Sequence, residues 1–502
     1  MYMLGKPTTA LLPFAVRGLR DNRKDVTDCF RSLANEGRFL VNHEGSAFFF
    51  DYNSKALMSI SEDNGSFLRY IGSVGATPDK VFIDKACRYA LANGTLTDIR
   101  RIAHVEINSK TVYVHSQGPK VYKVRSAEIV TISNGDDGIY FMAEKRSTPF
   151  RFFDELPTSD DLFHDLLVKK LCFATGTLDE EQSSFLLIVW FCSLFLAGLL
   201  PVSPLLLLAG PASSGKTTFM RCISELLFGR DLSVVRMPGD DKMFDAVIGK
   251  RSFVCLDGVT EWSDWLDERL EGVARKESIF VRRGQDYVEK RLDCSMAITT
   301  RQFPDEGLQC VNRLLPIMLK RPERNVPERT IIDGIRCNRD VIMTQLLVRL
   351  QRLLIDLGLP SSPGYGGSYM SADFADIAFR VARSIGFDTR VIEAFERLSS
   401  LHEAVLSGDQ QAVELLNLWV AMPGNEGREV KSADLHKELA VIAEERGKAI
   451  TLGERPFAHW LSKSIGRLRQ MFSIEKIKAR SNQRFYSFRS MTSDKKDMEC
   501  AP

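Results

Sequence analysis

The sequence predicts an α/β fold class, with a parallel-sheet core between a mixed α/β N-terminal domain and a C-terminal helical plus winged-helix region. In the middle of the chain, short apolar runs alternate with helical patterns, which is typical of a parallel sheet covered by helices. The 502 residues correspond to about three domains at roughly 100–200 residues each. The predicted divisions are an N-terminal domain at 1–150, the core at 151–329, a helical region at 330–412, a winged-helix-like domain at 413–490 and a disordered tail at 491–502.

Composition and charge exclude several classes of protein. The chain is 44% hydrophobic and 26% charged, like an ordinary globular protein, which excludes a collagen-like or disordered chain. The 67 Lys and Arg against 65 Asp and Glu leave a net charge of +2, so any polyanion site must be a local cluster. The ten cysteines form no CxxC pair, and no secretory signal pattern is evident. We therefore expect reduced thiols and a cytoplasmic protein.

The N-terminal domain carries strand-like runs at Arg38–Val41 and Ser46–Tyr52, separated by Asn/Gly turns. It contains no nuclease, metal or nucleophile constellation. It also lacks an Asp-x-Asp pair with a supporting His, which a primase centre would need. We therefore predict a recognition or scaffold domain.

An apolar run at Phe185–Leu200 precedes the core and is interrupted by Pro201. It is shorter than the ~20 residues that a helix needs to cross a bilayer. The apolar run Leu205–Leu208 follows and leads into a glycine-containing loop. We predict a buried helix, then a buried strand of a parallel sheet, and no membrane span.

The segment 210–217, GPASSGKT, fits the phosphate-binding pattern GxxxxGK[ST], and a helical pattern follows at Thr218–Phe228. In such a P-loop the glycines let backbone N–H groups surround a phosphate at the positive end of a helix. Lys216 would reach the β- and γ-phosphates, and Thr217 would offer a hydroxyl to Mg²⁺. With ATP and Mg²⁺ as ligands, the predicted binding residues are Gly210, Pro211, Ala212, Ser213, Ser214, Gly215, Lys216, Thr217 and Thr218.

The run Arg251–Asp257 is another apolar strand, and the acid at its end is positioned to hold the metal with Thr217. Gly258 follows, where many ATPases place a glutamate that polarises the attacking water. Glu261 is the nearest replacement. It is either that catalytic acid or a solvated acid on the following helix.

A third strand, Asp293–Thr300, ends in hydroxyls, with Arg301 next to them. Thr300 is either a polar sensor of the γ-phosphate or an ordinary strand threonine. Arg313 precedes the apolar run Leu314–Leu319. It is either a lone surface arginine or an arginine finger that neutralises charge in a neighbouring subunit's site, and its place in this series favours the finger.

The segment Ser278–Arg291 reads as two short strands around a glycine-containing turn. Its basic residues are Arg282, Arg283, Lys290 and Arg291. Such a hairpin could grip DNA phosphates in a central pore, or it could be a surface hairpin with solvated charges.

Helical periodicity dominates Thr330–Gln410, which a Gly/Pro/Ser-rich loop at Gly358–Ser368 interrupts. Beyond it, helical runs at Ser432–Arg446 and Pro456–Phe472 precede two strand-like runs, as in a winged helix. This last part contains a basic cluster opposed only by Glu475, consisting of Arg455, Lys463, Arg467, Arg469, Lys476, Lys478, Arg480, Arg484 and Arg489. The cluster suits DNA phosphates; a winged helix that docks on protein is the alternative.

The order of these elements resembles the AAA+ ATPase module of superfamily-3-like replicative helicases and primase-helicases from phages, plasmids and integrative elements. The likeness covers about Thr111–Arg489 and implies an α/β P-loop NTPase core that is AAA+-like. By match to the family pattern, the roles carried over fall on Lys216, Thr217, Asp257 and Arg313. Two positions depart from that pattern: Gly258 replaces an acid or Asn, and Thr300–Arg301 stands at the sensor asparagine.

The resemblance implies an ATPase that acts as a DNA helicase or translocase during replication of a mobile element. It also implies a homo-oligomeric ring, usually a hexamer, with DNA as its partner. Two alternatives stay open. One is a DNA-bound ATPase switch that hydrolyses ATP poorly, which Gly258 favours. The other is a defence or scaffold protein whose assembly is controlled by nucleotide without unwinding.

Overall fold

The computed structural model describes residues 26–490 except 175–176, 232–233, 284–285, 293, 302, 304–307, 325, 358–371, 384–386, 446–452, 455–456, 459, 463–467, 469–471 and 479–483. The described residues form two compact units. The first falls within Met1–Ile102, Tyr113–Lys123 and Val130–Pro149, and the second within Ala103–Val112, Val124–Ile129 and Phe150–Pro502. The chain passes for the last time from the first unit to the second between Pro149 and Phe150, next to the predicted boundary at 150. The predicted tail, 491–502, lies outside the described residues.

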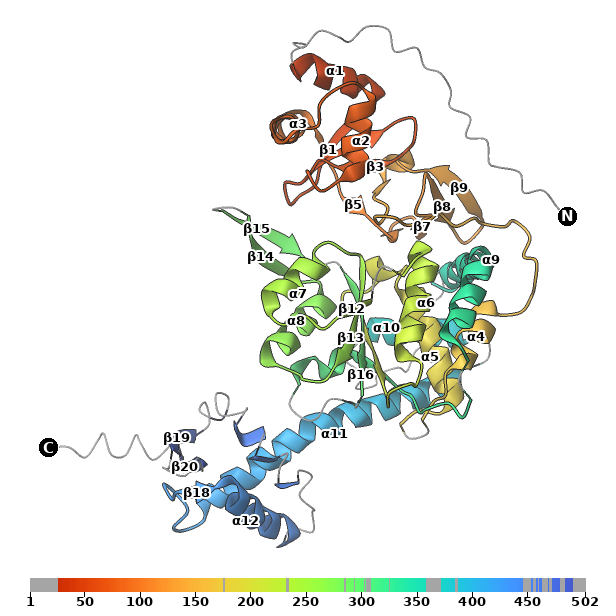
Figure 1. Cartoon of the computed structure of the whole chain (residues 1–502). Coiled ribbons are helices and arrows are strands. Elements are labelled where there is room, and N and C mark those ends of the chain that lie inside the picture. Colours follow the sequence, from red (N-terminus) through yellow and green to blue (C-terminus); the bar gives the residue numbers. More distant parts are fainter. Residues whose placement is uncertain are drawn as a thin grey trace. The chain divides into compact units, whose positions relative to one another are not determined.

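The first unit combines three helices with short strands (Figure 1). One sheet has the order β3-β2-β1-β4, in which β1 and β2 are antiparallel and match the two predicted runs. Its core is rich in aromatic residues such as Phe39, Phe49 and Phe67. The elements are α1 (Val26–Glu36), β1 (Gly37–Val41), β2 (Ala47–Asp51), β3 (Leu57–Ser59), α2 (Gly65–Ser73), α3 (Lys80–Asn93), β4 (Thr95–Leu96), β5 (Ile99–Arg100) and β10 (Tyr140–Phe141).

A separate four-stranded sheet has the order β6-β7-β8-β9. Its strands are β6 (Ala103–Glu106), β7 (Thr111–His115), β8 (Lys120–Val124) and β9 (Ile129–Ser133). Every residue of β7 is buried.

The second unit is built on a five-stranded sheet whose adjacent strands all run parallel, which confirms the predicted parallel sheet. The strand order is β12-β13-β16-β11-β17. The strands are β11 (Leu205–Ala209), β12 (Val234–Arg236), β13 (Phe253–Val259), β16 (Ser295–Thr300) and β17 (Leu314–Met318). Because the carboxyl ends of parallel strands meet at one edge, the segments that follow these strands gather there.

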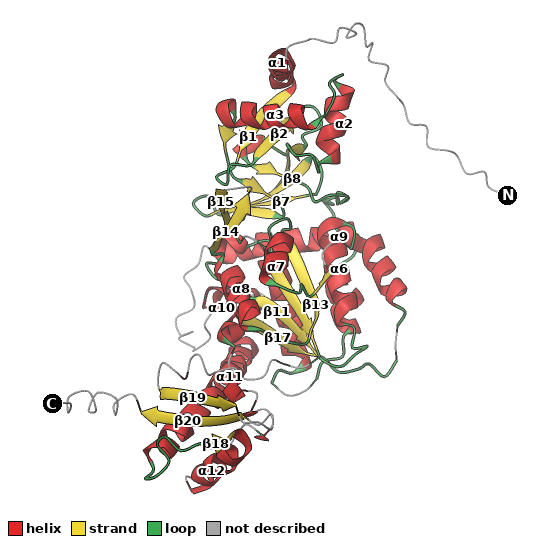
Figure 2. Ribbon diagram, turned by 60° about the vertical axis from the view of Figure 1, so that its left-hand side comes forward, coloured by secondary structure: helices red, strands yellow, loops and turns green. Residues whose placement is uncertain are grey.

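Helices cover both faces of this sheet (Figure 2). On one face, Leu205 and Leu207 of β11 share a core with Phe244 of α7 (Asp241–Ile248) and Leu266 of α8 (Asp264–Arg275). The opposite side carries α6 (Lys216–Phe228) and α9 (Glu328–Asp356), which lie side by side in Figures 1 and 2. Coverage on both faces explains why all five residues of β11 are buried and apolar.

The predicted buried apolar helix is α5 (Glu180–Ser193). A capping box between Asp179 and Gln182 starts it, and most of its following residues, from Phe185 to Ser193, are buried. Among the helices of the described chain, none is both long and apolar enough to cross a membrane.

The predicted helical region contains α9, α10 (Ala372–Arg383) and α11 (Asp388–Ala421). The predicted division at 412/413 falls inside α11, which runs through it without a break. The end of α11, including Leu416 and Trp419, packs into the C-terminal core with Leu435. The predicted loop Gly358–Ser368 lies outside the described residues.

The C-terminal part contains α12 (Ser432–Glu445) and a sheet of order β18-β20-β19, with β18 (Val430–Lys431), β19 (Phe472–Lys478) and β20 (Arg484–Ser490). These elements match the expected first helix and strand pair, and the winged-helix assignment stays a prediction. Most of the predicted helix Pro456–Phe472 and most side chains of the basic cluster lie outside the described residues; Arg489 is described and exposed.

Candidate nucleotide-binding site

The predicted phosphate-binding loop connects β11 to α6, at the edge where the parallel strands end. Two backbone contacts fix its start: the Gly210 N–H donates to Thr300 O at 3.2 Å, and the Leu319 N–H donates to Ala209 O at 2.7 Å. A Cβ on Gly210 would lie 2.3 Å from Leu319 O, so only glycine fits at this point. Within the loop, Ser213 has a φ of +64°, a strained conformation that is concentrated at functional sites.

Lys216 is the first residue of α6, and its ammonium group is turned into the loop. Nζ donates to Gly210 O and Pro211 O at 2.7 Å and to Ser214 Oγ at 3.0 Å. Burial lowers the pKa of Lys216, Asp257 opposes that shift, and the nearby Arg301 adds to it. The ammonium group is thus held by weak neutral acceptors, which phosphate oxygens can replace with charge-assisted bonds.

Thr217 and Asp257, which lie 40 residues apart in sequence, meet directly. Thr217 Oγ1 donates to Asp257 Oδ1 at 2.8 Å. The same carboxylate oxygen accepts a second bond, 2.7 Å long, from Thr299 Oγ1. Asp257 Oδ2 has no hydrogen-bond partner within the described part of the chain. The structure therefore brings together the two residues predicted to hold a metal and adds Thr299, which the sequence analysis did not select.

A β-bulge at the end of β13 produces this arrangement. Leu256 pairs with Ile298 and Val259 with Thr300, so Asp257 and Gly258 together face Thr299 alone. Gly258 has a φ of +74°, a conformation that glycine adopts without strain, and its N–H donates to Thr299 Oγ1 at 2.9 Å. The expectation that β13 ends at Asp257 is therefore wrong, because the strand continues through the bulge to Val259.

The bulge also determines which threonine of β16 contacts Asp257. Successive residues of a strand point to opposite faces. Thr299 therefore bonds Asp257, whereas the predicted sensor, Thr300, contributes its backbone carbonyl to the start of the loop. A glycine inside a strand pattern was the sequence signal for a bulge, but the partner residue depends on the register with β16.

The residues at this site fit Mg²⁺. A threonine hydroxyl and a carboxylate with a free oxygen are hard ligands of the type it prefers, and it usually takes few protein ligands alongside water and substrate phosphates. The described residues contain no group of three or more His, Cys, Asp or Glu side chains that could hold a metal by themselves. The site therefore suits a metal that binds together with a nucleotide.

Replacing Thr299 with Val removes the hydroxyl that holds Asp257 and keeps the shape of the side chain. We expect the apparent affinity for Mg²⁺ in a nucleotide-dependent assay to fall about 10- to 100-fold, the usual effect of losing a residue that orients a metal ligand. The measurement is a Mg²⁺ titration of nucleotide binding. Thr299→Ser, which restores a hydroxyl, is the control, and equal affinities for the Val and Ser variants would refute this role.

Two predicted catalytic residues lie apart from this group. Glu261 is exposed in the segment before α8 and makes no described contact with Thr217 or Asp257. Arg313 is only 7% exposed. Its Nε lies 3.2 Å from both carboxylate oxygens of Glu271, and its Nη2 lies 3.1 Å from Oε1. An ion pair with Glu271 of α8 thus engages the guanidinium of the buried Arg313, so Arg313 is not an exposed surface arginine in this chain, and the finger role stays a prediction.

The other loop residues differ in their exposure to solvent. Pro211, Ala212 and Ser213 are exposed, Ser214 is buried, and Thr218 is half-buried in the first turn of α6. Arg321, which follows β17, donates from Nε to Ala212 O at 3.4 Å. The sequence analysis missed this residue because nothing in the local pattern shows that β17 borders the loop.

The far end of α6 is anchored to α9. The buried Arg339 donates to the carbonyl oxygens of Leu226 and Leu227, at 2.9 and 3.3 Å. Arg336 pairs with the buried carboxylate of Glu225 at 2.7 Å. A cation at the last carbonyls of a helix satisfies groups that have no partner inside the helix. These contacts hold the helix that carries Lys216 and Thr217.

The predicted basic hairpin is confirmed as an element: β14 (Ser278–Arg283) pairs antiparallel with β15 (Asp286–Arg291). It follows α8 and extends away from the five-stranded sheet (Figure 1). Phe280 is 71% exposed, and Arg291 is exposed. The side chains of Arg282, Arg283 and Lys290 are outside the described set.

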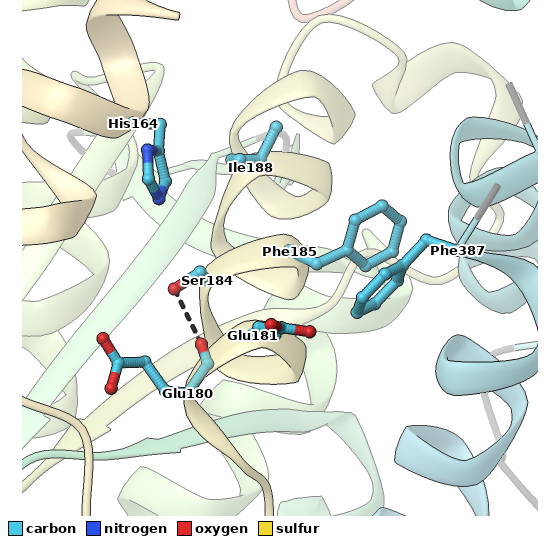
Figure 3. A pocket seen from close by; sticks show the side chains of 7 residues that line it. All are labelled: His164, Glu180, Glu181, Ser184, Phe185, Ile188 and Phe387. Atoms are coloured by element: carbon cyan, nitrogen blue, oxygen red, sulfur yellow. Dashed lines mark hydrogen bonds between the residues drawn. The ribbon is translucent and has the colours of Figure 1, made fainter. Parts of the chain in front are cut away.

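A pocket of about 550 Å³ also opens in the second unit (Figure 3). It is lined by His164 of α4 (Leu162–Leu166), by α5 residues between Glu180 and Ile188, and by Phe387. The rings of Phe185 and Phe387 lie 4.9 Å apart. No lining residue comes from the phosphate-binding loop or the strand ends, so this pocket is distinct from the candidate nucleotide site.

No protein-family model matches the chain, and no curated protein matches it. Among solved structures, it is similar to the apo C-terminal region of NrS-1, with 14% identity, a TM-score of 0.41, and coverage of 92% of this chain and 98% of that one. It is also similar to Cch of SCCmec type IV, described as an active helicase, with 11% identity, a TM-score of 0.37, and coverage of 91% and 93%.

Proposed function

We propose that this protein is an ATP-dependent DNA helicase or translocase that acts in replication of a mobile element. The observation that carries the proposal is the 2.8 Å hydrogen bond between Thr217 and Asp257 beside the loop that holds Lys216. A GxxxxGK[ST] loop and a strand-end aspartate in contact are the parts that hold a nucleotide with its metal.

In the proposed mechanism, the loop N–H groups and the positive end of α6 bind the phosphates. Lys216 exchanges its loop carbonyls for oxygens of the β- and γ-phosphates. Thr217 and Asp257 would hold Mg²⁺, which would supply positive charge against the phosphates. Thr299 keeps the Asp257 carboxylate oriented by its 2.7 Å bond. Glu261 is the proposed acid that orients the attacking water, and it would have to move toward the metal site.

The proposal assigns DNA binding to the β14–β15 hairpin and to the basic C-terminal region. The hairpin contributes positive charge and the exposed ring of Phe280, and such surfaces bind nucleic acid through phosphate contacts and base stacking. We further propose a homo-oligomeric ring, usually hexameric in the family that the sequence resembles, working in the cytoplasm. The nine described cysteines are all free thiols, which suits that compartment.

One observation favours a second function, a DNA-bound ATPase switch that binds nucleotide and hydrolyses it slowly. Gly258 lies in a bulge and has a positive φ, a conformation that favours glycine. The position after Asp257 therefore carries no acidic side chain that could orient the attacking water. The helicase or translocase and the switch would use the same nucleotide site and would differ in the rate of ATP hydrolysis.

Strand separation distinguishes the two. We expect the full chain to displace the short strand of a forked DNA duplex with Mg-ATP and not with a non-hydrolysable analogue. The expected reason is that hydrolysis at the Thr217–Asp257 site drives movement along the strand. Tight DNA binding without displacement under either condition would leave the switch as the function.

A further inference from the structure

The pocket beside α5 is built on one face of that helix. Glu181, Ser184 and Ile188 recur at three- and four-residue spacing, so they lie along the same side of the helix. His164 and Phe387 stand on either side of this row (Figure 3). The pocket, about 550 Å³ in volume, is therefore acidic where α5 begins and apolar two turns further along.

An arginine of the chain itself already binds two of the lining residues. The guanidinium of Arg390, in the first turn of α11, lies over the Phe387 ring at 5.4 Å from its centre. Its Nη2 donates to Asp179 Oδ2 at 2.7 Å, and its Nη1 donates to Glu181. A ring with carboxylates beside it offers a guanidinium both a cation–π contact and charged hydrogen bonds. The structure thus shows which cation this combination of groups accepts.

Glu180 is the second carboxylate of the lining, and its side chain is exposed. Its backbone carbonyl accepts a bond from Ser184 Oγ at 2.7 Å, a contact that does not involve the carboxylate (Figure 3). Arg390 pairs with the other two acids, and the described residues place no cation within ion-pair distance of the Glu180 carboxylate. Phe185 and the half-buried Ile188 continue the lining beyond it. An incoming cation would therefore meet an unneutralised carboxylate with an apolar surface beside it.

We propose that this pocket binds an arginine side chain of a partner protein, with the guanidinium at Glu180 and the methylene stem on Ile188 and the Phe387 ring. Charge complementarity defines the partner, because the lining contains two carboxylates and no lysine or arginine. The volume exceeds that of one side chain, so apolar residues that flank the arginine would fill the rest. Lysine would bind less well, since an ammonium group has no planar face to stack on a ring. The proposal does not depend on the nucleotide site, which shares no residue with this pocket.

The experiment titrates the full chain with a capped tripeptide that carries arginine between two leucines, followed by ligand-observed NMR. We expect saturable binding with a Kd on the order of 1 mM. Glu180→Gln should weaken it about 5-fold, as for the loss of an exposed ion pair at the strong end of the range. Ile188→Ala should weaken it about 4-fold, the effect of roughly one buried methylene. Glu268→Gln, which removes an exposed acid of α8 in the same unit, should leave it unchanged.

A second peptide, with glutamine in place of arginine, tests whether the guanidinium and Glu180 act on each other. It should bind the wild type about 5-fold more weakly than the arginine peptide does, and Glu180→Gln should weaken it no further. The unliganded Tm and the shift in Tm with Mg-ATP should be the same in Glu180→Gln and the wild type. These two values show that the variant is folded and that the nucleotide site is unaffected.

Three outcomes would overturn the inference. The first is no saturable binding of the arginine peptide to the wild type up to about 10 mM, a concentration ten times the expected Kd. The second is equal affinity of the wild type and Glu180→Gln for that peptide. The third is a glutamine peptide that binds the wild type as tightly as the arginine peptide does. If the peptide does not bind and Glu180→Gln lowers the mass of the assembly in light scattering, a second copy of the chain occupies the pocket instead of a separate partner.

Discussion

Replacement of Lys216 with Ala is expected to weaken ATP binding about 10- to 100-fold and to abolish hydrolysis. The ammonium group contacts only neutral oxygens in the loop, and a triphosphate offers it charge-assisted bonds instead. Bound nucleotide stabilises the folded chain by about 2.7 kcal/mol at a concentration of 100 times Kd. The shift in Tm that Mg-ATP causes therefore measures how much nucleotide binding the variant has lost.

The matched control is Lys242→Ala, which removes an exposed lysine of α7 in the same unit. It should keep the whole nucleotide-dependent shift in Tm. The unliganded Tm of each variant shows whether folding is intact. A full nucleotide-dependent shift in Lys216→Ala would mean that the loop is not the binding site.

The second large effect concerns Arg313. We expect Arg313→Ala to lower the free energy of unfolding by about 1.5–3 kcal/mol, because it removes the buried, charged hydrogen-bond partner of Glu271 and leaves that carboxylate with the half-exposed Arg275. The side chains of Arg313 and Glu271 are only 8% and 18% exposed. Denaturant unfolding measures the change.

Arg275→Ala is the control for this pair. Arg275 also bonds Glu271, at 2.7 Å, but its side chain is 49% exposed, so its loss should cost less than about 1 kcal/mol. A finger acting on a neighbouring subunit predicts the opposite pattern for Arg313→Ala, with unchanged stability and lost hydrolysis. That pattern would support the arginine-finger role of Arg313 and contradict a role in stabilising the fold.

The parts of the site that depend on neighbouring residues in sequence were predictable. The strand at Leu205–Ala209, the glycine spacing and the helix after it are local, and so is the Ser278–Arg291 hairpin. Each follows from periodicity, turn chemistry or a fixed motif spacing. Lys216 and Thr217 could therefore be placed on the loop before the fold was known.

The parts that depend on distant partners were not predictable. Thr299 contacts Asp257 because a bulge sets the register between β13 and β16. Arg313 is buried because Glu271, 42 residues away in sequence, lies opposite it. The division at 412/413 falls inside a helix that continues to Ala421, and Pro423 was the nearest sequence signal for its end.

The most direct test of the central claim is the rate of ATP hydrolysis by the purified full chain, with and without single-stranded and forked DNA, beside Lys216→Ala. The account predicts turnover that DNA stimulates and that the variant lacks. Nucleotide binding without ATP hydrolysis on any DNA would contradict the helicase or translocase function. It would leave an ATP-gated switch, in which glycine stands at position 258 instead of a catalytic acid.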